Sequence, residues 1–202
     1  MKNQSNFLAY VFLFLTVTFW AGNFVVGKFA SIYEVPPFSL NFYRWFFAWL
    51  ILAPFTLPEI IKKKDYIINN YKLFIILGVT SITIFNSIVY YSLNFTQVIS
   101  GVLMISTIPV MIMFFSSIFK IEKTNIFQII GVILSFLGVI IIITKANFEI
   151  LKNLNFNKGD ITMVVAMFSW ALYSTLLKRQ TYEISQLSLL QVVMSFGLVF
   201  LI

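Results

Sequence analysis

Long apolar runs alternate with short polar segments along the whole chain. A helix needs about 20 mainly apolar residues to cross the hydrocarbon core of a bilayer. Seven runs approach that length, namely 7–30, 37–57, 73–93, 98–119, 126–144, 161–177 and 186–202. The strands of a membrane barrel would instead alternate apolar and polar residues, whereas residues 131–144 are apolar on every side. The pattern predicts an all-α integral membrane protein with seven transmembrane helices.

The composition excludes most catalytic chemistry. Of the 202 residues, 60% are hydrophobic and 10% are charged, against about 25% charged in a soluble domain. The chain has no His and no Cys, so imidazole catalysis, thiol catalysis and thiolate metal sites are excluded. We therefore expect no enzyme, no metal and no cofactor. The net charge of +7 comes from Lys and Arg placed between the apolar runs, which favours a lipid bilayer as partner and not nucleic acid.

The distribution of Lys and Arg predicts the orientation in the membrane. One side of the predicted bundle holds Lys2, Lys62, Lys63, Lys64, Lys72, Lys120, Lys123, Lys178 and Arg179, and the other holds Lys28, Lys145, Lys152 and Lys158. Positive residues stay on the cytoplasmic side of a membrane. The N-terminus is thus predicted to be cytoplasmic, in a multi-pass protein of the cell inner membrane. Because only residues 94–97 separate the third and fourth spans, we expect these two to form a tight antiparallel hairpin.

The sequence also contains a weak internal repeat. Pairs of residues recur in the same order, namely Trp20-Ala21 as Trp170-Ala171, Lys28 as Lys178, Tyr33-Glu34 as Tyr182-Glu183 and Ser39-Leu40 as Ser188-Leu189. We predict a first five-helix repeat at 1–145, a connecting loop at 146–159 and the start of a second repeat at 160–202. An odd number of spans inverts the second copy, as in many secondary transporters. Because this copy has two spans, the chain looks like the first two-thirds of a ten-span protein.

Several motifs resemble the EamA-type branch of the drug/metabolite transporter superfamily. In chain order they are residues 19–28 (FWAGNFVVGK), Pro36-Pro37-Phe38 followed by 42–48 (FYRWFFA), 90–96 (YYSLNFT) with Pro109, Glu122, and Gly131 with Gly138. The resemblance implies ten spans in two inverted halves, with both termini in the cytoplasm. It also implies export or exchange of small metabolites such as amino acids.

Polar and aromatic residues within the spans are the candidates for a substrate cavity. Helical spacing places Trp20 and Asn23 on one face of the first span, while Asn86 and Tyr90 share a face of the third. The polar face of the fourth span contains Met104 and Thr107, and we expect it to meet that of the third across the hairpin. Trp170 and Tyr173 stand at the repeat positions of Trp20 and Asn23. The alternative interpretation is ordinary helix packing by Asn, Thr and Met.

Arg44 is the one charge well inside a predicted span. Its side chain either binds a substrate carboxylate with its two-pronged guanidinium or has a structural role, tying Tyr residues and carbonyl groups together. No Asp or Glu lies clearly inside any predicted span. Exchange or facilitated transport is therefore easier to support than proton coupling through an intramembrane carboxylate.

Other residues suggest packing and bending. Gly131, Ser135 and Gly138 share one face of the fifth span and predict close helix contact, within this half or in a homodimer. Pro109 predicts a kink in the fourth span. Lys28 is interpreted as an anchor at the membrane interface.

Together these features predict a secondary, non-ATP transporter of small metabolites that works by alternating access, and the resemblance implies that it is an exporter. The alternative is a non-transporting membrane subunit or scaffold derived from a truncated transporter.

Overall fold

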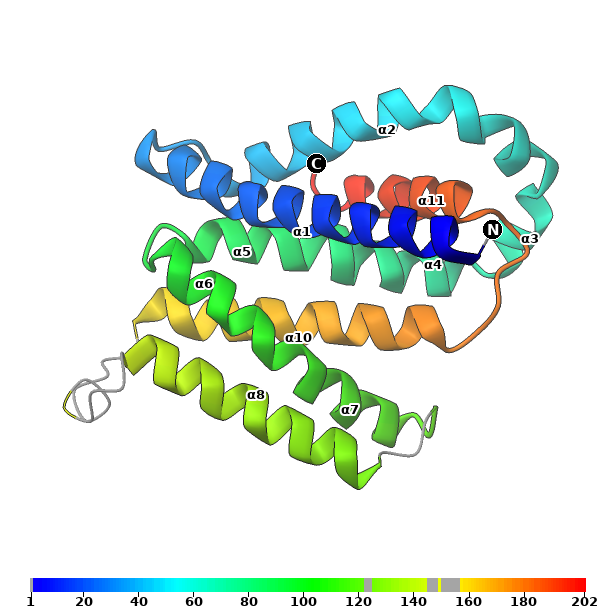
Figure 1. Cartoon of the computed structure of the whole chain (residues 1–202). Coiled ribbons are helices and arrows are strands. Elements are labelled where there is room, and N and C mark those ends of the chain that lie inside the picture. The colour runs from blue at the N-terminus through cyan, green and yellow to red at the C-terminus, as the bar shows by residue number, and fades with distance from the viewer. Residues whose placement is uncertain (1, 122–124, 145–148, 150–156) are drawn as a thin grey trace.

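The computed structural model describes residues 2–121, 125–144, 149 and 157–202, and this part of the chain is helical and contains no strand (Figure 1). The first span is α1 (Lys2–Ile32) and the second is α2 (Pro37–Lys62), which is followed by the short α3 (Lys64–Asn69). The third span is continuous but contains a π-helix, in the order α4 (Tyr71–Gly78), η1 (Val79–Phe85) and α5 (Asn86–Ser92). The all-α prediction is confirmed.

The remaining helices follow the other four apolar runs. The fourth run forms α6 (Val98–Met104), a 3-10 turn η2 (Ile105–Thr107) and α7 (Ile108–Ile118). The last three runs form α8 (Ile126–Thr144), α10 (Lys158–Lys178) and α11 (Gln186–Val199). Within the described part of the chain, four segments are long and apolar enough to cross a membrane, namely Phe7–Ile32, Pro37–Lys62, Tyr71–Ser92 and Lys158–Lys178. The chain is therefore a multi-pass membrane protein, while the exact number of crossings and the internal repeat stay predictions.

Local sequence explains where several helices begin. Pro37 stands in the first turn of α2, where a missing N–H costs nothing. Asn157 and Asp160 form a reciprocal capping box at the start of α10. Ser185 caps α11 by accepting a hydrogen bond from the Ser188 N–H.

Helix α10 lies between the third and fourth spans. It packs along α5 and η1 on one side and along α6 and α7 on the other (Figure 1). The expected tight hairpin between spans three and four is wrong, because these spans diverge after their connecting turn and α10 fills the space between them. Gly159 permits this close approach, since a Cβ there would lie 2.7 Å from the Ser92 carbonyl oxygen.

Helix α11 packs against α2 and α4, and the chain directions of the helices differ. In Figure 1, α1 and α11 run from right to left, whereas α2 and α10 run from left to right. Two clusters of buried side chains form the core. One surrounds Met163 and Met167 of α10, and the other surrounds Phe74 of α4 and Val193 of α11.

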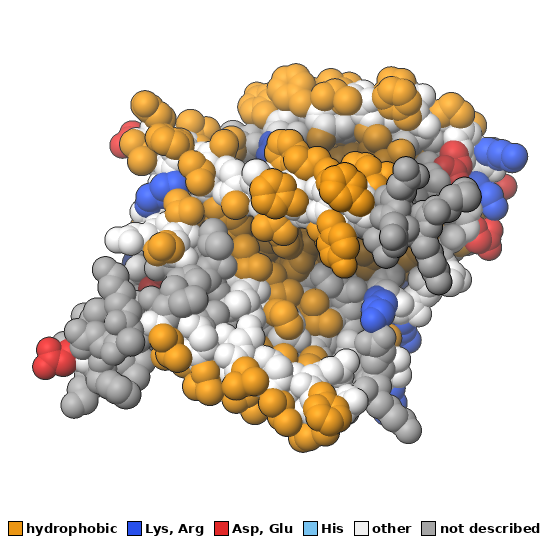
Figure 2. Space-filling view, viewed as in Figure 1, with side chains coloured by type: hydrophobic (Ala, Val, Ile, Leu, Met, Phe, Trp, Pro, Cys, Tyr) orange, Lys and Arg blue, Asp and Glu red, His pale blue; other side chains and the backbone are white. Residues whose placement is uncertain are grey.

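The outer helices expose apolar surface. Figure 2 shows hydrophobic side chains spread over the visible faces of α1, α2 and α8. The residues predicted to pack α8, Gly131 and Gly138, have no atom within 4 Å of an added Cβ, and Ser135 is exposed. Packing of this face within the described part of the chain is therefore contradicted, because α8 turns it outward. A homodimer contact there stays a prediction.

Candidate functional site

Arg44 joins three helices in the interior of the bundle. It lies seven residues after the start of α2, roughly 10 Å along the helix, and its two terminal nitrogens donate hydrogen bonds to Asn23 Oδ1 of α1 and Asn86 Oδ1 of α5, each 2.5 Å long. The Tyr90 hydroxyl also donates to Asn23 Oδ1, at 2.6 Å. The structure thus brings four of the predicted cavity residues into one hydrogen-bonded cluster.

The charge of Arg44 is not matched by an acid. Among the described residues no carboxylate lies within ion-pair distance of its guanidinium. The guanidinium carbon instead lies 4.8 Å from the ring centre of Trp45 and 5.4 Å from that of Tyr90. Ring faces and neutral amide oxygens stabilise a cation weakly compared with a carboxylate. The positive charge of Arg44 is therefore not neutralised by any described residue.

The π-helix fixes the direction in which Asn86 points. In η1 the hydrogen bonds of a regular α-helix are interrupted, and side chains bind carbonyl groups of this segment. Asn86 Nδ2 donates to the Ser81 carbonyl at 2.7 Å, so its Oδ1 is directed to Arg44. Asn41 Nδ2 donates to the Ile82 carbonyl and Ser169 Oγ to the Thr80 carbonyl, each at 2.8 Å. The irregular helix thereby orients one ligand of the arginine.

Aromatic rings gather next to this cluster. Trp20 of α1 and Trp170 of α10, the two tryptophans of the predicted repeat, have ring centres 5.5 Å apart. The ring centre of Trp170 also lies 4.6 Å from that of Phe85 and 5.1 Å from that of Tyr173. Phe85 precedes Asn86, and Trp20 lies one turn before Asn23, so the rings and the Arg44 cluster are neighbours.

Met104 and Thr107 lie outside this cluster. Thr107 Oγ1 donates to the Met104 carbonyl of its own helix at 2.7 Å, and Met104 packs against the core around α10. The polar face of the third span does not meet the fourth span as expected, because α10 lies between them. Pro109 is the second residue of α7, directly after the 3-10 turn, so span four is interrupted where a kink is predicted.

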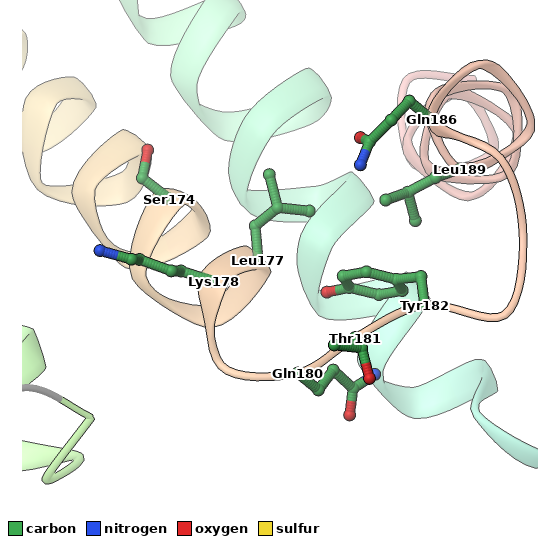
Figure 3. Close-up of a pocket in the computed structure, with 8 residues that line it drawn as sticks. All are labelled: Ser174, Leu177, Lys178, Gln180, Thr181, Tyr182, Gln186 and Leu189. Atoms are coloured by element: carbon green, nitrogen blue, oxygen red, sulfur yellow. The ribbon is translucent and has the colours of Figure 1, made fainter.

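A pocket of about 520 Å³ lies elsewhere, between the end of α10 and the start of α11 (Figure 3). Its lining comprises Ser174, Leu177, Lys178, Gln180, Thr181, Tyr182, Gln186 and Leu189. None of the predicted cavity residues belongs to it. Burial raises the pKa of the Tyr182 hydroxyl to about 12, and this hydroxyl has no hydrogen-bond partner among the described residues.

Comparison with known proteins identifies the family. Residues 7–144 match the EamA-like transporter family. The chain belongs to this family. It is 27% identical over 193 residues to a Bacillus subtilis protein named uncharacterized transporter YyaM, a match that covers 96% of this chain and 63% of that protein. It is 26% identical over 200 residues to an uncharacterized transporter of Archaeoglobus fulgidus, covering 98% of this chain and 66% of the relative.

The chain thus spans slightly less than two thirds of the length of these relatives. No solved structure is significantly similar to it. The Arg44 cluster lies within the part that matches the EamA-like family, whereas Trp170, Tyr173 and the pocket lie after it.

Sequence reasoning misses two functional candidates in this EamA-like chain and the partners of a third. Asn41 is fully buried and binds the π-helix, and the signal for it was a lone amide in an apolar run. Glu59 lies within α2 because this helix continues one turn beyond the predicted end of the span at residue 57. Sequence reasoning names Lys28 as a membrane-interface anchor, and that interpretation stays a prediction. Its ammonium donates to the Leu93 and Thr96 carbonyls, at 2.7 and 3.0 Å, and so caps the end of α5.

Proposed function

We propose that the protein is a secondary transporter of small carboxylate-bearing metabolites such as amino acids, which exports them by alternating access. It lies in the cytoplasmic membrane with its N-terminus inside the cell. Membership of the EamA-like family and the names of the relatives support transport. The opposite chain directions of α1 and α10, and of α2 and α11, support an inverted repeat (Figure 1).

The observation that carries the proposal is the cation of Arg44 without an acidic partner among the described residues. Charges inside a membrane are costly, and they mark substrate or ion pathways. The oxygens of Asn23 and Asn86 occupy the two positions that the oxygens of a bound carboxylate would take on the guanidinium fork. A substrate replaces these amides when the site opens, and the rings of Trp20 and Trp170 lie ready for an ammonium or an apolar side chain.

The test is transport by purified protein in lipid vesicles, with a set of radiolabelled amino acids and other carboxylates inside and out. Arg44→Lys keeps the charge but loses the planar fork. We expect about a tenfold fall in carboxylate exchange, which corresponds to one charge-assisted hydrogen bond. The matched control is Arg179→Lys, the same change at the exposed end of α10, which should leave exchange unchanged.

Equal exchange by wild type and Arg44→Lys, at equal protein in the vesicles, contradicts the assignment of Arg44. If Arg44→Lys fails to reach the vesicles as a folded protein, the structural interpretation of this residue is favoured. The outward-facing small residues of α8 support a second candidate function, that of a membrane subunit or scaffold. A folded wild-type protein that moves none of the carboxylates favours that candidate.

A further inference from the structure

A carboxylate from the first half of the chain caps a helix of the second half. Glu59 lies in the last turn of α2, and its Oε1 accepts a hydrogen bond from the Ser185 backbone N–H at 2.8 Å. Its Oε2 accepts from the hydroxyls of Ser185 and Ser188, each at 2.5 Å. The residues that meet here are more than 120 positions apart in the chain. Glu59 therefore ties the end of α2 to the beginning of α11.

This contact suits the chemistry of a helix N-terminus. The first N–H groups of a helix lack partners within the helix, and the helix dipole favours negative charge there. Lys63 and Glu183 form an ion pair of 3.3 Å one turn away, but their side chains are 39% and 64% exposed, and such solvent-accessible pairs contribute little. Glu59 is thus the main polar tie at this end of the two helices.

The other end of α11 is fixed by backbone contact. A Cβ added at Gly197 would lie 2.5 Å from Ile82 Cβ and 2.9 Å from the Gly78 carbonyl oxygen. A Cβ at Gly78 would lie 2.7 Å from the Gly197 backbone nitrogen. Gly197 is twelve residues from Ser185, roughly 18 Å along the helix. Helix α11 is thus interlocked at its C-terminal end and held by side chains at its N-terminal end.

The interface between these two ends contains unsatisfied polar atoms. Gln191 of α11 is fully buried, and its Nε2 donates to the Trp49 carbonyl at 3.2 Å while its Oε1 has no partner among the described residues. Trp45 Nε1 of α2 is likewise buried without a described partner. Buried polar atoms without hydrogen bonds destabilise the state that buries them. Entry of water between α2 and α11 would relieve both, so this interface is poised to open.

We propose that Glu59 is a latch, and that its release lets α11 swing away from α2 about the Gly78–Gly197 contact. The swing opens a path from the Lys- and Arg-rich end of the molecule, past Gln191 and Trp49, to Trp45 and its neighbour Arg44. The pocket beside the start of α11 (Figure 3) gives this end of the helix room to move. The proposal rests on the proposed function, because it assigns the cytoplasmic entrance of the same site.

The absence of native Cys makes an accessibility test direct. Gln191→Cys places one thiol on the α2–α11 interface, six residues from the Gly197 pivot, where Gln191 is fully buried and donates to the Trp49 carbonyl at 3.2 Å. The protein is placed in lipid nanodiscs and reacted with a hydrophilic maleimide. Glu59→Gln on this background should raise the labelling rate about tenfold, since the carboxylate's charge-assisted hydrogen bonds are lost. The matched control Glu183→Gln breaks the exposed ion pair and should change the rate less than about twofold.

Two further variants keep the outcome decisive. Ser185→Ala with Ser188→Ala removes the hydroxyl donors and leaves the charge of Glu59. This double variant should also raise the labelling rate, and it serves as the test of the latch if Glu59→Gln does not fold. Ser92→Cys is a reporter at the opposite end of the bundle, at a fully buried residue, and it should stay unreactive in every variant. An unchanged rate at Gln191→Cys, or an equal rise at both reporters, overturns the latch. No substrate is used, so a failure of the latch is distinct from a failure of the transport proposal.

Discussion

At the scale of single residues, the effect of a buried hydroxyl on stability depends on whether it has a hydrogen-bond partner. Tyr90 is 2% exposed and donates to Asn23 Oδ1, which also accepts from Arg44. The Tyr182 hydroxyl is buried as well but has no partner among the described residues. Removing a paired hydroxyl loses a hydrogen bond, whereas removing an unpaired one relieves a desolvation cost. The same substitution at these two positions should therefore have opposite effects.

Tyr90→Phe should destabilise the protein by about 1 kcal/mol, and Tyr182→Phe should be neutral or stabilising. Because burial raises the pKa of the Tyr182 hydroxyl to about 12, above the value of about 10 in an unfolded chain, the folded protein keeps this proton at a higher pH than the unfolded chain does. The free energy of unfolding of the wild type should therefore fall as the pH rises from about 10 to 12, and Tyr182→Phe should remove that part of the fall. Thermal unfolding in detergent at pH 8 and at pH 11 checks both statements. A larger loss for Tyr182→Phe than for Tyr90→Phe at pH 8 would contradict them.

The sequence predicted the residue types of the Arg44 cluster but not its partners. An Arg, two Asn and a Tyr in apolar runs are costly unless they meet polar groups, so Asn23, Arg44, Asn86 and Tyr90 could be singled out. Periodicity gives the face of a helix on which a residue lies, not the helix that it meets. Met104 and Thr107 were therefore grouped with this site although α10 separates the fourth span from it.

At the scale of helices, close packing depends on glycines that no motif marked. Gly78 and Gly197 let α4 and α11 meet backbone to backbone, yet each is a lone glycine in an apolar run. Gly131 and Gly138 have the spacing of a packing motif but face outward on α8. All seven apolar runs are helical because length and hydropathy decide this locally. Pairing of helices depends on contacts distant in sequence, so the hairpin of spans three and four was predicted wrongly.

These glycines provide a matched pair of substitutions. Gly78→Ala forces a methyl group against the backbone of α11, and we expect a loss of about 1–3 kcal/mol. Gly131→Ala meets open space and replaces a poor helix former, so it should be neutral or stabilise by up to about 1 kcal/mol. Unfolding temperatures of both variants in the same detergent test this. Equal losses would show that α11 is not packed against α4 in this way.

At the scale of the whole molecule, the two ends of the bundle are tied differently. At the end opposite Glu59, Ser92 and Thr96 are buried and Gly159 is packed against the Ser92 carbonyl. Thr96 Oγ1 donates to Asp160 Oδ1 at 2.7 Å, and Lys28 binds two carbonyls of the same turn. The contacts of Glu59 with Ser185 lie at the exposed surface. This end is thus held by fewer and more exposed contacts than the opposite end, so it should open more readily.

Hydrogen exchange of the purified protein in nanodiscs tests this asymmetry. Backbone amides of residues 93–97 should exchange more slowly than those of 180–185, because more side-chain contacts hold this turn and its local opening is therefore rarer. Asp160→Ala removes the acceptor of Thr96 and half of the α10 capping box, each worth about 1 kcal/mol. It should speed exchange at 93–97 about tenfold and leave 180–185 unchanged, and Asp65→Ala, at an exposed acid of α3, should alter neither. Faster exchange at both ends in Asp160→Ala would mean that the ends open together, which alternating access forbids.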